Sequence, residues 1–277
     1  MLKRYVRRHP VRTQRFLEIL PGFTSWSLIL FPLWGSFLIP EIVAYYIIAF
    51  DVYWLYRSLT MSVLAIIAHF KIRASIAYDW LRDVKKLEHW KKMKHIIVIP
   101  TYTEPLSTLE RTLKTLTRQT FPLKQLFITL SFEEREGEDA KHKAKVLQEQ
   151  FGQTFGSLWI TYHPDIHGEV KGKSSNTSWG AKVAKQKLIA EQHEDINYVT
   201  ITSEDADALF HPHYFSALTY EFLTNPKRYN RIWQPSIMFY NNIWKVAPPI
   251  RVLASIFSVN QMFILMRSDR LVNFSTY

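Results

Sequence analysis

Residues 95–105 read HIIVIPTYTEP, a short apolar run that ends at a proline and continues into polar residues. A continuous apolar run of this length is typical of a strand buried on both faces of a parallel sheet. The chain contains three more runs of this kind, at 126–130, 158–162 and 198–202. Helical patterns are expected at 105–116, 137–151, 174–190 and 212–223, and a further strand near 231–238. Strands that alternate with helices predict an α/β fold with a mainly parallel sheet.

The composition excludes several classes of protein. The chain has 277 residues, 47% hydrophobic and 15% aromatic, which argues against a disordered protein. Because it has no cysteine, it contains no disulfide framework, thiolate zinc site or cysteine nucleophile. Its net charge of +11 suits a partner that is either nucleic acid or an anionic membrane.

The position of the charge decides between these partners. Residues 1–16 have six basic and no acidic residues, and residues 71–94 have eight basic against three acidic. Between them, residues 23–39 carry no charge, and Asp51 is the one charged residue in 42–56. Spans of about 17–20 apolar residues are long enough to cross a bilayer. The sequence therefore predicts a transmembrane helical hairpin over 23–70, with a turn at Pro40-Glu41 and a second helix that runs on through 58–70.

The two basic flanks orient this hairpin. Positively charged flanks stay on the cytoplasmic side, so we expect both ends there. Residues 1–22 are then a basic cytoplasmic segment, residues 71–94 a basic linker helix, and residues 95–277 a cytoplasmic domain. A third transmembrane span before residue 71 would place the second basic flank, residues 71–94, on the non-cytoplasmic side of the membrane. We expect a multi-pass protein of the plasma or inner membrane whose partner is the lipid bilayer, not nucleic acid; two buried helices of a soluble protein are the alternative.

Acidic residues follow the fourth predicted strand. Asp205 and Asp207 stand two residues apart, directly after the apolar run. Ligands of α/β sheets bind at the carboxyl ends of the strands, where two carboxylates suit Mg²⁺ or Mn²⁺ together with phosphates. The same residues, with Ser203, also suit capping of the next helix. Both interpretations stay open at this point.

Residues 172–174 (GKS) begin a predicted helix and resemble part of a phosphate-binding P-loop. The P-loop spacing requires glycine at 167, which is histidine, so a P-loop phosphotransferase is a weaker alternative. At a helix N-terminus, Lys173 still suits contact with a phosphate. We interpret His211 and His213 as surface histidines because no third ligand for zinc is near them in the sequence.

Three segments together resemble the inverting family 2 glycosyltransferases: 97–105 (IVIPTYTEP), 173–176 (KSSN) and 202–207 (TSEDAD). The nearest likeness is the membrane-anchored branch that includes cellulose synthase and poly-N-acetylglucosamine synthase. Residues 233–242 (WQPSIMFYNN) also resemble the family's strand toward the acceptor side. The likeness covers roughly residues 22–277.

This resemblance implies a GT-A fold, a Rossmann-like and mainly parallel sheet, that transfers a sugar from a nucleotide donor, commonly a UDP-sugar, to a glycan or lipid acceptor. It implies Mg²⁺ or Mn²⁺ as cofactor, with Asp205 and above all Asp207 as ligands. The residues that it implies for the nucleotide sugar are Pro100, Thr101, Tyr102, Glu104, either Glu133 or Glu134, Lys173, Asn176 and Asp205.

Two departures from the family pattern concern the donor loop and the acceptor side. Thr103 replaces the usual asparagine before Glu104, and after Asp207 the acids are Glu221 and Asp269 alone, neither a convincing general base. The processive members' Gln-x-x-Arg-Trp motif is absent. We expect an N-terminal part of a longer enzyme, incomplete at the C-terminus, with its base beyond Tyr277. A non-catalytic pseudo-transferase that acts as a scaffold is the alternative.

Overall fold

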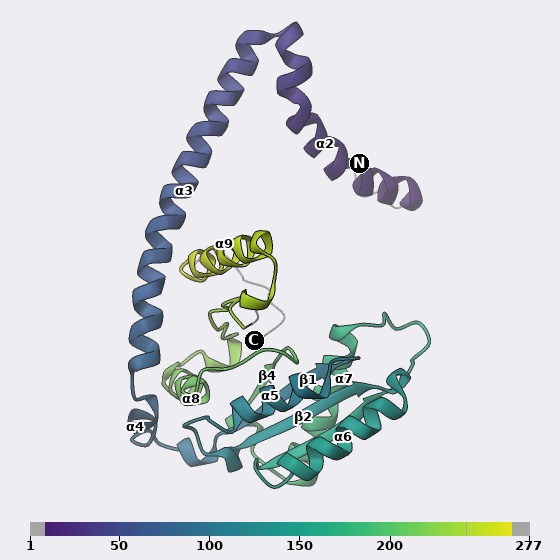
Figure 1. Cartoon of the computed structure of the whole chain (residues 1–277), viewed down its shortest axis with the longest axis vertical. Coiled ribbons are helices and arrows are strands. Elements are labelled where there is room, and N and C mark those ends of the chain that lie inside the picture. The colour runs from purple at the N-terminus through teal and green to yellow at the C-terminus, as the bar shows by residue number, and fades with distance from the viewer. Residues whose placement is uncertain (1–8, 242, 268–277) are drawn as a thin grey trace. The chain divides into compact units, whose positions relative to one another are not determined.

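The computed structural model describes residues 9–241 and 243–267. Met1–Val63 and Leu64–Tyr277 form two compact units, and the boundary between them falls inside helix α3. The helices and strands in chain order (Figure 1) are α2 (Pro10–Leu38), α3 (Pro40–Ala77), α4 (Trp80–Val84), β1 (Lys94–Thr101), α5 (Leu106–Leu116), β2 (Leu126–Glu133), α6 (Glu138–Phe151), β3 (Ser157–His163), α7 (Lys173–Lys185), β4 (Val199–Ser203), α8 (Tyr214–Thr224) and α9 (Pro248–Leu265).

Helices α2 and α3 meet at a single non-helical residue, Ile39. The predicted turn at Pro40-Glu41 is wrong, because Pro40 is the first residue of α3. The first helical position has no intrahelical partner for its N–H, so proline begins a helix there without loss. The hydroxyl of Tyr46 donates a hydrogen bond to the carbonyl oxygen of Leu28 at 3.1 Å, which joins the two helices.

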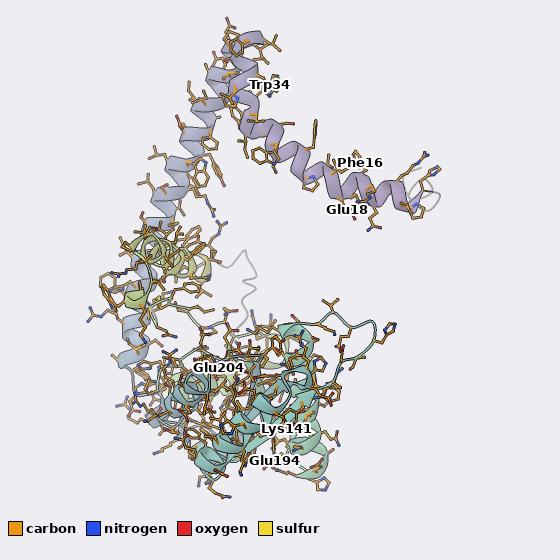
Figure 2. The ribbon with its side chains drawn as sticks, turned by 45° about the vertical axis from the view of Figure 1, so that its right-hand side comes forward. Phe16, Glu18, Trp34, Lys141, Glu194 and Glu204 are labelled. Atoms are coloured by element: carbon orange, nitrogen blue, oxygen red, sulfur yellow. The ribbon has the colours of Figure 1, made fainter. Side chains whose placement is uncertain are left out.

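Helices α2, α3 and α9 are each long and apolar enough to cross a membrane. The side chains of Phe16 and Trp34 on α2 are 61% and 48% exposed and point away from the helix (Figure 2). The predicted continuation of the second helix through 58–70 is confirmed, since α3 extends to Ala77. Helix α9 was not predicted from the sequence, and it adds a third apolar helix after the sheet.

The predicted linker helix over 71–94 is wrong as a single element. Helix α3 ends at Ala77, α4 spans Trp80–Val84, and a 3₁₀ turn covers Trp90–Lys92. A new helix begins at α4 because the side chain of Asp79 accepts a hydrogen bond from the N–H of Arg82 at 3.1 Å. An aspartate in this position caps a helix N-terminus and so favours a break before it.

The sheet has four parallel strands in the order β3-β2-β1-β4. Strand β1 is central: Ile97 is paired with Ile128 of β2 on one side and with Thr202 of β4 on the other. The predicted α/β fold with a parallel sheet is therefore confirmed, with each of the four strands at its predicted place. Parallel pairing puts the carboxyl ends of all four strands at one edge.

Alternate residues of β1 serve two cores, one on each face of the sheet. Ile97 and Ile99 belong to the larger core, with residues of α5, α6 and α8. Ile96 and Val98 belong to the smaller core, with residues of α7. Helix α7 approaches closely because Gly180 has no Cβ, which would lie 2.9 Å from Cγ1 of Val98.

The predicted strand near 231–238 is wrong, because these residues have no regular secondary structure. Pro235 lies within the segment, and proline donates no hydrogen bond to a sheet ladder. The apolar side chain of Met238 instead packs in a small cluster with Ala65 and Ala68 of α3 and Met262 of α9. The apolar run thus reflects contact with helices.

A buried histidine joins β1, β4 and α8. The ring of His95 is fully buried, with Nδ1 2.6 Å from the hydroxyl of Thr200 and Nε2 2.8 Å from that of Thr219. Burial lowers its pKa from 6.5 to about 3, so the ring is neutral in the folded protein at neutral pH. Between these two pH values the unfolded chain binds one more proton than the folded chain.

This difference predicts a pH-dependent loss of stability. The contribution of His95 is complete above about pH 6.5 and is lost on acidification towards pH 3, by up to ~1.4 kcal/mol per pH unit. We expect His95→Gln to reduce the fall in unfolding midpoint between pH 7 and pH 5, measured by tryptophan fluorescence of the detergent-solubilised chain. The exposed His142→Gln serves as control; equal pH dependence in both variants would contradict the assignment.

Candidate functional site

A cleft of about 730 Å³ lies at the carboxyl edge of the sheet. The predicted site residues that line it come from the end of β1, the end of β2, the first turns of α7 and the loop after β4. They are Pro100, Thr101, Tyr102, Glu104, Glu133, Lys173, Asn176, Asp205 and Asp207. Glu134 is exposed in the short turn after β2 and does not line the cleft. Of the two glutamates left open by the sequence, the structure brings Glu133 to the site.

Lys173 and the two aspartates form the charged part of the cleft. Lys173, at the start of α7, pairs with Asp205 in the loop after β4. Partial burial lowers the pKa of Lys173, while the nearby charges of Asp207 and Glu104 oppose that effect. Asp205 is half-buried and Asp207 is exposed to the cleft. Three carboxylates therefore surround one ammonium group.

The acid directly before the two aspartates, Glu204, does not share their environment. Glu204 is fully buried, does not line the cleft, and its carboxyl oxygens have no hydrogen-bond partner within the structure. Burial raises the pKa of Glu204 well above its ordinary value. Asp205 and Asp207 in the loop after β4 line the cleft, whereas Glu204 is enclosed within the protein.

The loop after β1 is organised by one carboxylate oxygen. Oε2 of Glu104 accepts hydrogen bonds from the hydroxyl of Thr101 at 2.7 Å and from the N–H of Tyr102 at 2.5 Å. Thr103, which lies between Tyr102 and Glu104 in the sequence, has a φ of +64°. A β-branched residue is strained in this left-handed region, which asparagine adopts more easily.

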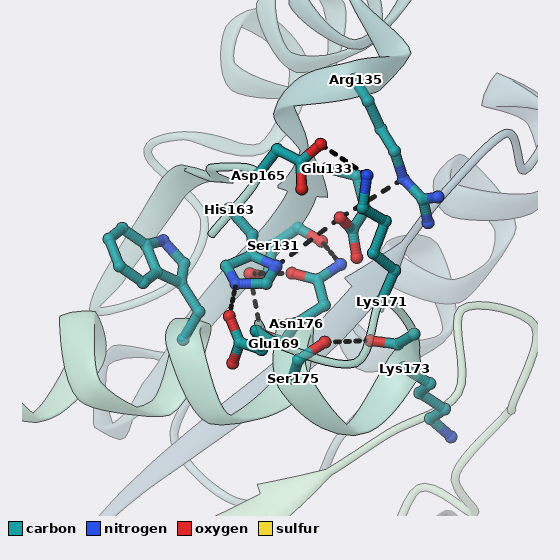
Figure 3. Close-up of polar contacts among 12 residues, drawn as sticks. Ser131, Glu133, Arg135, His163, Asp165, Glu169, Lys171, Lys173, Ser175 and Asn176 are labelled. Carbon is teal, nitrogen blue, oxygen red and sulfur yellow. Dashed lines mark hydrogen bonds and ion pairs between the residues drawn. The ribbon is translucent and has the colours of Figure 1, made fainter. Parts of the chain in front are cut away.

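Arg135 was missed by the sequence analysis. Its guanidinium lies 4.1 Å from the ring centroid of Tyr102, and its Nε lies 3.6 Å from Oε2 of Glu133 (Figure 3). The signal available in the sequence was its position two residues after the end of a buried strand. Other cleft residues not predicted from the sequence are Ser107, Thr108, Arg111 and Lys245.

Asn176 lines the cleft, but its side-chain amide is occupied by neighbouring strands. Its Oδ1 accepts a hydrogen bond from the hydroxyl of Ser131 at 2.6 Å (Figure 3). Its Nδ2 donates to the carbonyl oxygens of Ser131 at 2.8 Å and Thr101 at 3.4 Å. The residue joins the start of α7 to the ends of β1 and β2, and thereby positions Lys173.

The loop between β3 and α7 is held by its own ion pairs (Figure 3). Nε2 of His163, at the end of β3, lies 3.1 Å from Oε2 of Glu169. Nζ of Lys171 lies 2.5 Å from Oδ2 of Asp165. Residues 164–172 thus separate β3 from α7, which leaves too long a connection for the tight phosphate cradle of a P-loop.

No group of three or more His, Cys, Asp or Glu side chains suited to a metal ion occurs among residues 9–241 and 243–267. Asp205 and Asp207 nevertheless fit Mg²⁺ or Mn²⁺, because these ions are commonly held by one or two carboxylates with phosphate and water oxygens completing the set. The sequence predicted that His211 and His213 are surface histidines, and His211 is exposed. His213 is half-buried, however, not a fully exposed surface residue.

Comparison with known proteins adds little to this geometry. No family model matches the chain. No curated protein matches it either. Among solved structures, the mannosyltransferase PcManGT from Pyrobaculum calidifontis in complex with GDP-Man and Mn²⁺ is similar over 60% of this chain, with 16% identity and a TM-score of 0.29. The matched part is 45% of that protein's chain, and this weak likeness assigns no activity.

The strain at Thr103 can be tested by substitution. We expect Thr103→Asn to stabilise the protein by about 1 kcal/mol, because asparagine tolerates a positive φ better than threonine. The thermal unfolding midpoint should rise by roughly 2–4 °C. Thr117, with φ of −66°, is the control, since Thr117→Asn relieves no such strain. A midpoint unchanged or lowered in Thr103→Asn would contradict the interpretation.

Proposed function

We propose that this chain is a membrane-bound glycosyltransferase with a GT-A fold, which transfers a sugar from a nucleoside-diphosphate donor, and does so with inversion. The observation that supports this most strongly is the meeting of Asp205, Asp207 and Lys173 in one cleft at the carboxyl edge of a parallel sheet. Ligands of open α/β sheets bind at this edge. A diphosphate with a divalent cation provides opposite charges for all three side chains.

Each part of the donor has a suitable place in the cleft. Tyr102, 41% exposed, and Arg135 offer flat surfaces for a nucleobase, and Glu133 and Glu104 offer hydrogen-bond acceptors. The N-terminus of α7 faces the cleft through Gly172 and Lys173. Backbone N–H groups at a helix N-terminus and the helix dipole favour phosphate. UDP is the nucleotide that the sequence resemblance favours.

The chain's carboxylates determine how a metal ion would act. Asp207, with Asp205, would hold Mg²⁺ or Mn²⁺ beside the diphosphate. When bound, the ion stabilises the negative charge that develops on the leaving diphosphate. Lys173, beside Asp205, adds a second positive charge, and the loops that line the cleft hold donor and acceptor in place.

Membrane attachment belongs to the same proposal. Helices α2 and α3 form the transmembrane hairpin, with the basic residues of 1–16 and 71–94 on the cytoplasmic side. The catalytic domain then faces the cytoplasm, where nucleotide sugars are made. The acceptor is a glycan or a lipid.

Two alternative functions, a P-loop phosphotransferase and a pseudo-transferase scaffold, make different structural predictions. A P-loop phosphotransferase is disfavoured because residues 164–172 separate β3 from α7 and Lys173 pairs with Asp205. A pseudo-transferase scaffold would retain the fold without turnover. Of the two acids after Asp207, neither of which was predicted to be the general base, Glu221 is exposed on α8 and Asp269 lies outside the described residues.

The metal dependence of nucleotide binding is the decisive test. We expect the detergent-solubilised full chain to bind UDP by calorimetry only with Mn²⁺ or Mg²⁺. Asp207→Ala should weaken this binding about 10- to 100-fold, because one charged ligand is worth about 1.5–3 kcal/mol. GDP is titrated in parallel, because the test concerns metal-dependent nucleotide binding and not the preference for one nucleobase.

Glu149→Ala provides the matched control, because Glu149 is an exposed acid on α6 outside the cleft. It should bind UDP as the wild type does. Equal affinity in wild type and Asp207→Ala, with or without chelator, would contradict the proposal. Binding of ATP that is lost in Lys173→Ala, with no binding of UDP or GDP, would favour the phosphotransferase.

A further inference from the structure

A second cavity, of about 740 Å³, adjoins the donor cleft within the unit that contains the sheet. Asp205 and Asp207 line both cavities, so the two meet at the proposed metal ligands. The other walls come from the last turns of α3, the start of α8, residues 235–241, Ile243 and the first turns of α9. We call this cavity the apolar chamber; its apolar lining includes Ile72, Ile76, Phe210, Ile237, Met238 and Ile250.

The charges of the apolar chamber differ from those of the donor cleft. The cleft has Arg111, Arg135 and Lys245 in its lining. No lysine or arginine is among the described residues that line the chamber. Besides its two aspartates, the chamber's titratable groups include His211, whose pKa is lowered by burial and then by the nearby His213. An anionic occupant is therefore disfavoured, and so is a polar glycan within largely apolar walls.

The helices that form the chamber also carry apolar side chains on their outer surfaces. On α9, Val252, Ile256 and Phe257 are 59%, 52% and 54% exposed. On the part of α3 that belongs to the same unit, Ile66 and Phe70 are 58% and 66% exposed. Apolar side chains exposed together in this way indicate contact with lipid, and both helices are long and apolar enough to enter a membrane. The helices that line the chamber are therefore also suited to contact with the lipids of a bilayer.

One side chain of the chamber is suited to accept a proton. Nδ1 of His213 lies 2.9 Å from the carbonyl oxygen of Tyr78. Because a carbonyl oxygen only accepts hydrogen bonds, Nδ1 carries the proton, and Nε2 of the neutral ring has a free lone pair. His213 also lines the chamber. A hydroxyl acceptor requires such a base, whereas an ionised phosphate acceptor does not.

We propose that the apolar chamber binds the acceptor, and that the acceptor is a neutral lipid with a free hydroxyl group, such as a diacylglycerol. This inference rests on the proposed function. The hydroxyl oxygen of the lipid forms a bond to the anomeric carbon, and the bond from that carbon to the diphosphate breaks. The electron pair of the broken bond leaves with the nucleoside diphosphate, and the hydroxyl proton passes to Nε2 of His213.

Photo-crosslinking tests where the lipid binds, without relying on turnover. The full chain in phosphatidylcholine nanodiscs is labelled with a diazirine-bearing diacylglycerol, and labelled peptides are identified by mass spectrometry. We expect labels within 72–80, 208–217 or 235–254, which contain the chamber residues. An excess of unlabelled diacylglycerol should compete, whereas a polyprenyl phosphate or a soluble oligosaccharide should not. Competition by either of these alone would overturn the choice of a neutral lipid.

Two neighbouring substitutions on α9 make the test specific. Ala254 lines the chamber, while Leu253 is 49% exposed and does not line it. We expect Ala254→Trp to lower crosslinking at least ~10-fold by filling the space, and Leu253→Trp to leave it unchanged. Ala217→Phe fills the same chamber from α8 and serves if Ala254→Trp does not fold. Equal labelling of the chamber peptides in wild type and in the filled variants would overturn the inference.

UDP calorimetry on the same samples separates the two proposals. Normal metal-dependent UDP binding without chamber labelling would reject the lipid acceptor alone, whereas absence of nucleotide binding would reject the proposed function. Transfer is then measured from radiolabelled UDP-glucose, UDP-N-acetylglucosamine and GDP-mannose to diacylglycerol. His213→Gln should keep UDP binding and crosslinking but lower the transfer rate about 100-fold, with His142→Gln, an exposed histidine of α6 outside both cavities, as control. Equal rates in both variants, or no transfer by a wild type that binds lipid in the chamber, would overturn the catalytic assignment.

Discussion

Strand β1 is paired in parallel with β2 on one side and with β4 on the other, and the site depends on this double pairing. The register opposite Val98 places Ser203 at the end of β4, so Asp205 and Asp207 follow at the same edge where Pro100 and Thr101 end β1. On the opposite side, Ser131 is paired with Pro100. A shift of one residue would reverse the faces of all side chains in the strand and separate these groups. Backbone pairing therefore determines which side chains the cleft contains.

The parts of the fold that were predictable from the sequence are those with a single structural explanation. Continuous apolar runs such as 95–99 are explained by burial on both faces, and the structure places each of the four strands there. The segment near 231–238 is apolar only in part, and its Met238 packs with residues of α3 and α9, a tertiary contact that no local pattern identifies. Helix α9 was missed for a related reason: its apolar positions are spread around the helix, and several of them are exposed.

The candidate site was predictable by position more than by role. Residues directly after strands were correctly expected at one edge, since topology alone brings them together. Asn176 and Glu104 show where this reasoning ends, because much of their hydrogen-bonding capacity is used to hold neighbouring backbone. Arg111 reaches the cleft from a helix, and Lys245 from a segment far along the chain. Contacts of that kind depend on tertiary packing, which the spacing of residues does not encode.

The ion pair between Lys173 and Asp205 has a thermodynamic consequence under the proposed function. A nucleotide alone would offer Lys173 a phosphate but leave Asp205 facing an anion, and a cation alone would compete with the ammonium for the same carboxylate. When the nucleotide and the cation bind together, the ion pair between Lys173 and Asp205 is replaced by two ion pairs, one between Lys173 and a phosphate and one between Asp205 and the cation. Binding of either ligand then raises the affinity for the other by the same factor, as linkage requires. The internal ion pair therefore disfavours binding of the nucleotide alone or of the cation alone, and favours binding of the two together.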